Sequence, residues 1–112
     1  MKISVVKEIL NADVVCGEDL LDEEVFSAFG CDLMSDVLAF VNNQGLLLTG
    51  LNNPQVVRTA FMMDMKAIVF VRGKTPDDEV IQLAKMKDII LLKTDDRLYS
   101  ACGKLYNAGL IQ

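Results

Sequence analysis

The hydrophobic residues between Leu46 and Tyr106 form the same pattern three times along the chain. Each pass has a short apolar run, a polar corner, and then a stretch in which apolar residues recur every three or four positions. The apolar runs cover 46–48, 67–71 and 89–92. Runs of this length between polar corners predict buried strands, and the recurrence that follows them predicts amphipathic helices. The pattern therefore predicts three strand–helix units.

The polar corners predict where these helices begin. In Asn53-Pro54 and Thr75-Pro76, a side chain that can cap a helix comes immediately before a proline, which is well tolerated at the first helical position. We expect Thr94-Asp95 to begin the last helix, and Gly109 follows its end.

The first half of the chain predicts four further elements. Apolar spacing over 5–10 indicates a short opening helix, and 12–17 indicates a strand that ends at a glycine turn. The stretch 24–29 indicates a second strand across from the first, and the spacing over 35–42 predicts another helix. We interpret the acidic run between the two strands, 18–24, as a solvated turn because it lacks the spacing of a calcium loop.

These elements predict a single α/β domain that covers residues 1–112, a length that supports one hydrophobic core. Right-handed connections make the three later strands parallel. Their nearly continuous apolar composition is typical of strands whose two faces are both covered by helices. We expect the two early strands to extend the sheet, at least one of them antiparallel. The predicted fold is therefore a mixed, mainly parallel sheet flanked by helices.

Composition and charge narrow the choice of partners. Apolar residues make up 52% of the chain, which is high for a small domain, so we expect part of this surface to be buried in a homodimer. The net charge of −5 repels phosphate backbones and argues against nucleic acid as a partner. No apolar run reaches the roughly 18 residues of a membrane span. Charges at Lys7 and Glu8 come too early for a signal peptide, so we expect a cytoplasmic protein.

Residues that commonly carry catalysis or hold metals are scarce. The chain has no histidine, so the commonest general base near neutral pH is missing. Cys16, Cys31 and Cys102 are far apart in the sequence, and we interpret them as buried thiols instead of disulfides or metal ligands. Neither a G-x-G-x-x-G motif nor a P-loop occurs, so no cofactor is predicted. We therefore do not expect an enzyme.

Polar residues after the three apolar strands form the candidate ligand site. In an open α/β sheet, the carboxyl ends of parallel strands meet at one edge, where helix amino termini attract anions. Cations gather at this edge of an acidic chain, which favours a small anion, a nucleotide phosphate or a partner's carboxylate. The residues predicted to bind it are Thr49, Gly50, Asn52, Asn53, Arg72, Gly73, Lys74, Thr94 and Asp95. The same residues also fit a structural role as helix caps, turns and solvated cations.

Two long runs of the chain resemble a known family. The runs Val14–Val25 and Ala67–Val80 resemble the DRTGG domain family, and they are also similar to the amino-terminal domain of HPr kinase/phosphorylase. Together these resemblances extend from Ile3 to Leu105. The family is named for a G-D-R corner and a T-G-G corner, which here read Thr49-Gly50-Leu51-Asn52 and Val71-Arg72-Gly73-Lys74, so only the glycines match.

The resemblance implies an α/β module that regulates or oligomerises without chemistry of its own. Such modules accompany other domains in some phosphotransacetylases and CBS-domain pyrophosphatases, or stand alone, sometimes among hydrogenase-related proteins. Our first hypothesis is therefore a sensor of a small anionic metabolite or nucleotide. The alternative is an interaction or oligomerisation module that docks on a larger metabolic or hydrogenase-related enzyme through an apolar face.

Overall fold

Five strands form one mixed sheet in the computed structural model, which describes residues 1–111. The order across the sheet is β1-β5-β4-β3-β2. The strands are β1 (Asp13–Cys16), β2 (Ala28–Gly30), β3 (Leu46–Thr49), β4 (Ala67–Phe70) and β5 (Ile90–Lys93). Strands β2 to β5 are mutually parallel, and β1 pairs antiparallel with β5. The α/β class and the mixed, mainly parallel sheet are therefore confirmed.

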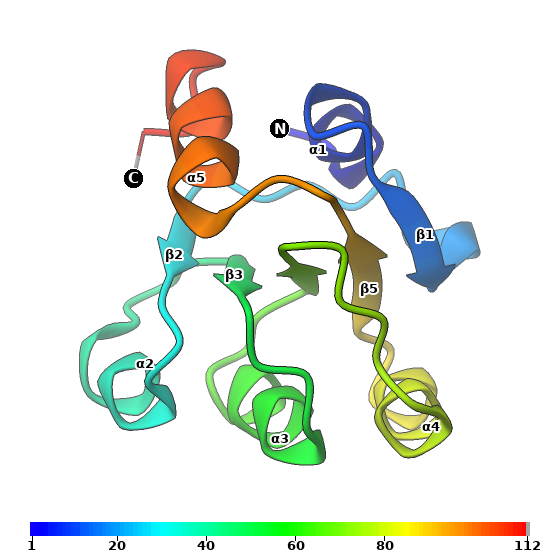
Figure 1. Cartoon of the computed structure of the whole chain (residues 1–112). Coiled ribbons are helices and arrows are strands. Elements are labelled where there is room, and N and C mark those ends of the chain that lie inside the picture. Colours follow the sequence, from blue (N-terminus) through cyan, green and yellow to red (C-terminus); the bar gives the residue numbers. More distant parts are fainter. Residues whose placement is uncertain (112) are drawn as a thin grey trace.

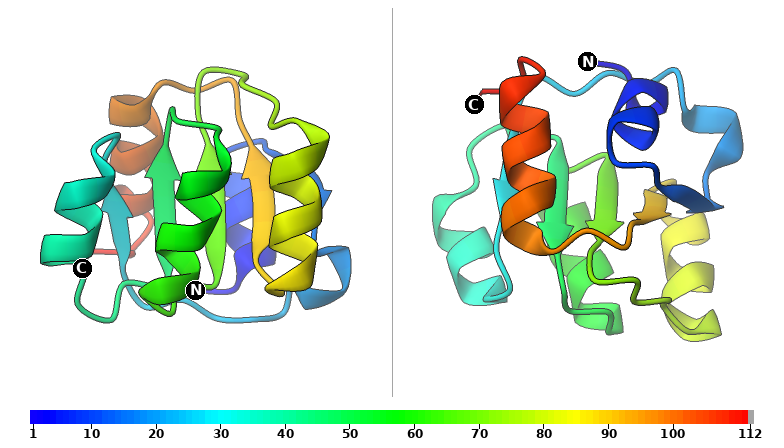
Figure 2. Two further views of the ribbon diagram at one scale, coloured as in Figure 1. Left: turned by 90° about the horizontal axis from the view of Figure 1, so that it is seen from below. Right: turned by 45° about the horizontal axis from the view of Figure 1, so that its top comes forward.

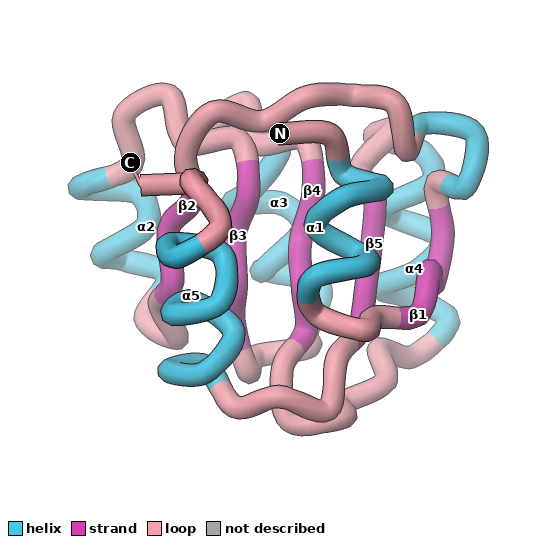
Figure 3. Tube along the Cα trace, turned by 90° about the horizontal axis from the view of Figure 1, so that it is seen from above, coloured by secondary structure: helices cyan, strands magenta, loops and turns pink. Residues whose placement is uncertain are grey.

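Helices cover both faces of this sheet and give the molecule three layers (Figures 1 and 3). The helices are α1 (Ile3–Ile9), α2 (Met34–Phe40), α3 (Pro54–Met62), α4 (Asp78–Met86) and α5 (Leu98–Asn107), with a short 3-10 helix η1 (Glu18–Leu20) after β1. Helices α2, α3 and α4 lie on one face, and α1 and α5 lie on the other (Figure 2). Right-handed crossovers place α2, α3 and α4 on the same face, because the strands they connect follow one another across the sheet.

The core consists of two apolar layers, one on each side of the sheet. On β3, Leu46 and Leu48 pack towards α1 and α5, while Leu47 packs towards α2, α3 and α4. Every residue of β3 and β4 is buried. Both faces of these strands need apolar side chains, which explains why the sequence shows continuous apolar runs instead of a polar–apolar alternation.

The predicted pairing of the two early strands is wrong. Strand β2 begins only at Ala28, pairs in parallel with β3, and lies at the opposite edge of the sheet from β1. Before it, Glu24 makes one isolated antiparallel bridge with Lys2. A hairpin and two separate edge strands have the same hydrophobic pattern, so only the contacts with distant strands distinguish them.

Two of the three predicted helix starts are also wrong. Helix α3 does begin at Pro54, with Asn53 at its N-cap, although the Asn53 side chain makes no capping hydrogen bond. Helix α4 begins two residues after Pro76, where Asp77 Oδ1 accepts a hydrogen bond from Val80 N at 3.2 Å. Helix α5 begins at Leu98, whereas the sequence predicted its start at Thr94-Asp95. The carboxylate of Asp77 is a strong N-cap in its own right, so Thr75 is not needed there.

Three further features bear on the predictions from composition. Within residues 1–111, no helix is long and apolar enough to cross a bilayer. The three cysteines are unpaired thiols, with Cys16 buried and the other two half-buried. The acidic run after β1 contains η1, so this turn is partly helical.

Candidate ligand site at the strand carboxyl ends

The corners after β3, β4 and β5 meet at one edge of the sheet, as the sequence predicts (the strand arrows point to it in the left panel of Figure 2). Hydrogen bonds join them. Asn52 Nδ2 donates to Thr75 O at 3.4 Å, and Gly73 N donates to Thr94 O at 2.8 Å. These bonds connect the first corner to the second and the second corner to the third. The three corners that carry the predicted site residues are therefore joined at one edge of the sheet.

The Arg72 guanidinium lies directly over Gly50. A Cβ atom at position 50 would overlap Arg72 Nη2, and the three nearest heavy atoms to that Cβ would all belong to this guanidinium. Glycine therefore makes room for a cation from the neighbouring corner. Arg72 itself has a φ of 62°, which is uncommon for a residue with a side chain, and its amide donates to Asp96 O at 2.7 Å. Strained backbone of this kind is frequent at functional sites.

Gly73 continues the left-handed turn with a φ of 66°. A Cβ added there would come within 2.9 Å of Asp95 Oδ1, so the Asp95 carboxylate lies against the backbone of the second corner. Two successive left-handed residues turn the chain back from β4 towards the third corner. The glycine is required both by the backbone conformation and by the close approach of Asp95.

Asp32 belongs to the same edge, and the sequence analysis missed it. It lies between β2 and α2, and its Oδ1 accepts hydrogen bonds from Gly50 N at 2.7 Å and from Thr49 Oγ1 at 3.0 Å. An aspartate shortly after a predicted strand is a sequence signal that could have indicated a site residue. Because the sequence did not show that β2 lies beside β3, it did not place Asp32 next to the first corner.

Cations at this edge come from two different strands. Lys93, at the end of β5, donates from Nζ to Thr75 Oγ1 at 3.0 Å. Arg72 and Lys74 are exposed and form no ion pair with any residue of the described chain. Nearby, Lys104 pairs with Asp96 at 2.8 Å. Arg72 and Lys74 are therefore free to meet an anion.

The predicted site residues divide into buried and accessible groups. Thr49 and Thr94 are buried, and their hydroxyls act inside the protein: Thr94 Oγ1 donates to Leu10 O at 2.8 Å, and Thr49 Oγ1 accepts from Leu51 N at 3.2 Å. The accessible group consists of Asn53, Arg72, Gly73, Lys74 and Asp95, with Asn52 half-buried and Gly50 covered by Arg72. The buried threonines hold the corners in shape, and the accessible residues form the surface.

The ionisable groups of the core do not provide a reactive thiolate. Burial raises the pKa of the Cys16 thiol, partly offset by a backbone hydrogen bond, and burial also raises the pKa of the Cys102 thiol. Both thiols therefore stay protonated near neutral pH. Across residues 1–111, no three cysteine, aspartate or glutamate side chains are grouped so that they could hold a metal ion.

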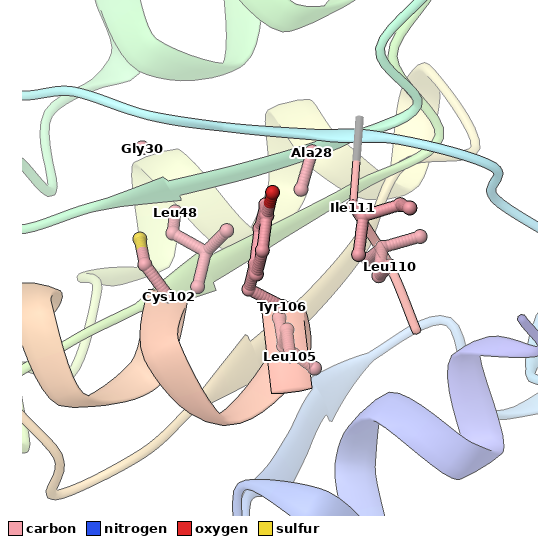
Figure 4. Close-up of a pocket in the computed structure, with 8 residues that line it drawn as sticks. All are labelled: Ala28, Gly30, Leu48, Cys102, Leu105, Tyr106, Leu110 and Ile111. Carbon is pink, nitrogen blue, oxygen red and sulfur yellow. The ribbon is translucent and has the colours of Figure 1, made fainter. Parts of the chain in front are cut away.

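A separate apolar pocket of about 220 Å³ lies between α5 and the β2–β3 side of the sheet (Figure 4). Tyr106 projects from α5 between Leu48 and Ile111, and Cys102 points towards Gly30. The pocket is lined by Ala28, Gly30, Leu48, Cys102, Leu105, Tyr106, Leu110 and Ile111. It contains none of the predicted ligand-binding residues, so the polar edge and this pocket are distinct features.

Comparison with a solved structure supports the fold. The chain is similar to the regulatory region of Clostridium perfringens pyrophosphatase, a crystal structure of CBS and DRTGG domains in complex with the activator diadenosine tetraphosphate. The TM-score is 0.75 at 17% sequence identity, and the match covers 93% of this chain and 45% of the other. This chain therefore spans less than half the length of its structural neighbour.

Comparison by sequence identifies the family. No curated protein sequence matches the chain significantly. The family model of the DRTGG domain matches residues 5–108, which is nearly the whole chain. Two long runs resembled this family in the sequence, and its fold agrees with that of the structural neighbour. The chain belongs to the DRTGG domain family.

Proposed function

We propose that this chain is a non-catalytic regulatory module that binds a small anionic ligand at the strand carboxyl ends, with a nucleotide as the first candidate. The observation that carries this proposal is the Arg72 guanidinium over Gly50, on a residue whose backbone is left-handed. The proposal also draws on the structural neighbour, a regulatory region crystallised with a nucleotide activator.

The edge is suited to negative charge. Helix α3 begins there with no side chain bonded to its first amides, so the positive end of its dipole is open to a ligand. Arg72 and Lys74 add two cations without ion-pair partners among residues 1–111. In a chain of net charge −5, these two cations offer an anion a position at this edge.

The edge is also suited to hydroxyl or amino groups. The Asp32 and Asp95 carboxylates lie beside the Gly50 and Gly73 corners and can accept further hydrogen bonds. A nucleotide carries both features that this surface offers to bind, a phosphate for the cations and sugar hydroxyls for the carboxylates. A ligand with only an anionic group would use half of the site.

Ligand binding at this edge would join segments that are far apart in the sequence. The corners follow three neighbouring strands and are already connected by single hydrogen bonds, such as that from Asn52 to Thr75. A ligand that contacts two corners stabilises the folded protein relative to the unfolded chain, by about 2.7 kcal/mol when its concentration is 100 times the Kd. This stabilisation is the means by which such a module would signal occupancy.

A thermal-shift screen of the purified protein tests the proposal. The ligands are nucleotides, phosphorylated metabolites and small carboxylates, each compared with its ionic-strength control. We expect at least one nucleotide to raise the melting temperature in the wild type and in Arg58→Ala, because Arg58 is an exposed arginine of α3 that bonds only Gln55. The same ligand should not stabilise Arg72→Ala. A hit that survives in Arg72→Ala, or a screen with no hit, would count against a ligand site at this edge.

A further inference from the structure

The two edges of the sheet are protected differently. Strand β1 forms one edge and β2 forms the other. The register of β1 shifts between Val14 and Cys16, and the strand begins with the exposed charge of Asp13. Irregular register and charged side chains keep a sheet edge from pairing with another chain. Strand β2 contains no charge, no proline and no register shift, so only its short length limits pairing there.

The outer side of β2 presents open backbone groups. Cys31 N donates to Leu48 O at 3.0 Å, so the backbone of Cys31 and, by alternation, that of Phe29 face β3. The N–H and C=O groups of Ala28 and Gly30 therefore point away from the sheet. Among residues 1–111, neither residue makes a backbone hydrogen bond in a turn or loop. Gly30 is exposed, and the exposed surface of a glycine is backbone.

The apolar pocket of about 220 Å³ lies beside this edge, which is flanked by α5 and α2 (Figures 1 and 3). Ala28 and Gly30 form part of its lining, and Tyr106 and Ile111 on its α5 side are 61% and 57% exposed. Leu33, at the N-cap of α2, is 56% exposed. An apolar cavity of about 150 Å³ in another protein holds benzene, so this pocket has room for one apolar side chain.

We propose that the β2 edge binds an extended segment of a partner protein, which joins the sheet as an additional strand. Backbone groups of the segment bond those of Ala28 and Gly30, and one of its apolar side chains enters the pocket beside α5. Open amides and carbonyls at strand spacing match another strand and not a helix. A small apolar molecule would fill the pocket but leave these backbone groups unpaired. This inference is independent of the ligand proposed for the strand carboxyl ends.

The charges around β2 favour a basic segment. Residues 8–57, which include β2 and α2, contain nine acidic residues and no lysine or arginine. Two of these acids, Asp32 and Asp36, follow β2 closely, and Asp36 lies in the first turn of α2. On the other side of the edge, Lys104, the lysine of α5, pairs with Asp96 at 2.8 Å, which reduces its repulsion of a cation. The partner segment therefore carries lysine or arginine beside its apolar residues, and an acidic segment is repelled.

Selection from a library of short, random displayed peptides tests the proposal on the full chain. The wild type should enrich peptides with apolar side chains at alternate positions, with lysine or arginine and few acids. Tyr106→Lys places a cation in the pocket wall and should lose this enrichment. Tyr99→Lys is the matched control and should keep it, because Tyr99 is 92% exposed on the same helix and does not line this pocket.

Methylation of peptide amides distinguishes strand pairing from a purely apolar contact. In a paired strand only every second amide of the selected peptide faces β2. N-methylation of one alternating set of amides should weaken binding by at least about tenfold, and methylation of the other set should change it by less than about twofold, as measured by calorimetry. On the protein, the amides of Ala28 and Gly30 should exchange with solvent more slowly when the peptide is bound, which nuclear magnetic resonance detects.

Thermal unfolding shows whether each variant is folded, and Ile111→Lys, at the same pocket, replaces Tyr106→Lys if that variant is not. The proposal would be overturned by a selection without alternating apolar sequences, by equal effects of the two methylation sets, by binding that survives the pocket variant, or by binding lost in Tyr99→Lys. Protection of the Ala28 and Gly30 amides that grows with the concentration of the free protein would also overturn it, because a second copy would then occupy the edge.

Discussion

Asp32 Oδ1 accepts a hydrogen bond of 2.7 Å from Gly50 N, so the connection after β2 holds the corner after β3. The same oxygen accepts the Thr49 hydroxyl at 3.0 Å. Because Asp32 is accessible to solvent, water can reach the Gly50 amide once the carboxylate is removed, which limits the loss of folding stability. The contact joins two loops that are 18 residues apart and prepares the first corner of the proposed site.

Replacement of Asp32 by alanine should lower the free energy of unfolding by about 1–2 kcal/mol, because a charge-assisted hydrogen bond to a backbone amide is lost. Urea unfolding measures this change. Asp22→Ala is the control, since the Asp22 side chain is 93% exposed and its nearest cation is 3.8 Å away, so its ion pair contributes little. Equal effects in both variants would show that the contact with Gly50 does not stabilise the corner.

The close approach of Arg72 to Gly50 predicts a coupled pair of substitutions. Gly50→Ala should displace the guanidinium, with a stability loss of under about 1 kcal/mol because a long exposed side chain can move away. In an Arg72→Ala background, Gly50→Ala should lower the stability less, because the guanidinium atoms that the new Cβ would meet are absent. A double-mutant cycle of unfolding free energies measures the difference. Additive effects would contradict the contact.

The left-handed backbone of Arg72 predicts that glycine is more stable than alanine at this position. Arg72→Gly should be more stable than Arg72→Ala by about 1 kcal/mol, because glycine adopts a positive φ without strain. Both variants should lose the proposed ligand. Denaturant titration compares the two, and Arg58→Gly against Arg58→Ala should give the opposite order, because Arg58 lies inside a helix.

The buried hydroxyl of Thr94 connects β5 to the end of α1. Thr94→Val should lower the free energy of unfolding by about 1–3 kcal/mol, because it leaves the Leu10 carbonyl without its 2.8 Å hydrogen bond in a buried position. Thr94→Ser keeps the hydroxyl and should lose less. Chemical denaturation measures both variants. A valine variant as stable as the serine variant would contradict the role of this bond.

The raised pKa of Cys16 predicts a loss of stability in alkali. Its folded-state pKa lies above the ordinary value of 9.0, so the folded protein holds the thiol proton more tightly than the unfolded chain does. The stability that the protonated thiol contributes is fully present below pH 9.0 and is lost as the pH rises through the folded-state pKa. Unfolding measured below and above this value should show a steeper decline in the wild type than in Cys16→Ala. Parallel declines would contradict the assignment to this thiol.

Much of the fold follows from local sequence. The apolar runs at 46–48 and 67–71 are strands β3 and β4, and Asn53-Pro54 begins α3 as predicted. These features depend on neighbouring residues, because apolar spacing and proline geometry act within a few positions. The convergence of the three corners also follows from the sequence, since parallel strands with short crossovers bring their carboxyl ends to one edge. The family resemblance was likewise visible in two long runs and is confirmed.

Only the tertiary structure decided which segments from distant parts of the chain meet. The place of β2 beside β3, and with it the contact of Asp32 with Gly50, depends on pairing between separate strands. The sequence contained Arg72 and Gly50 as two corner residues, but their contact arises because β3 and β4 are neighbours and Arg72 turns left-handed. Local spacing encodes the elements, whereas the contacts between elements depend on how their apolar faces pack together, which is a property of the whole chain.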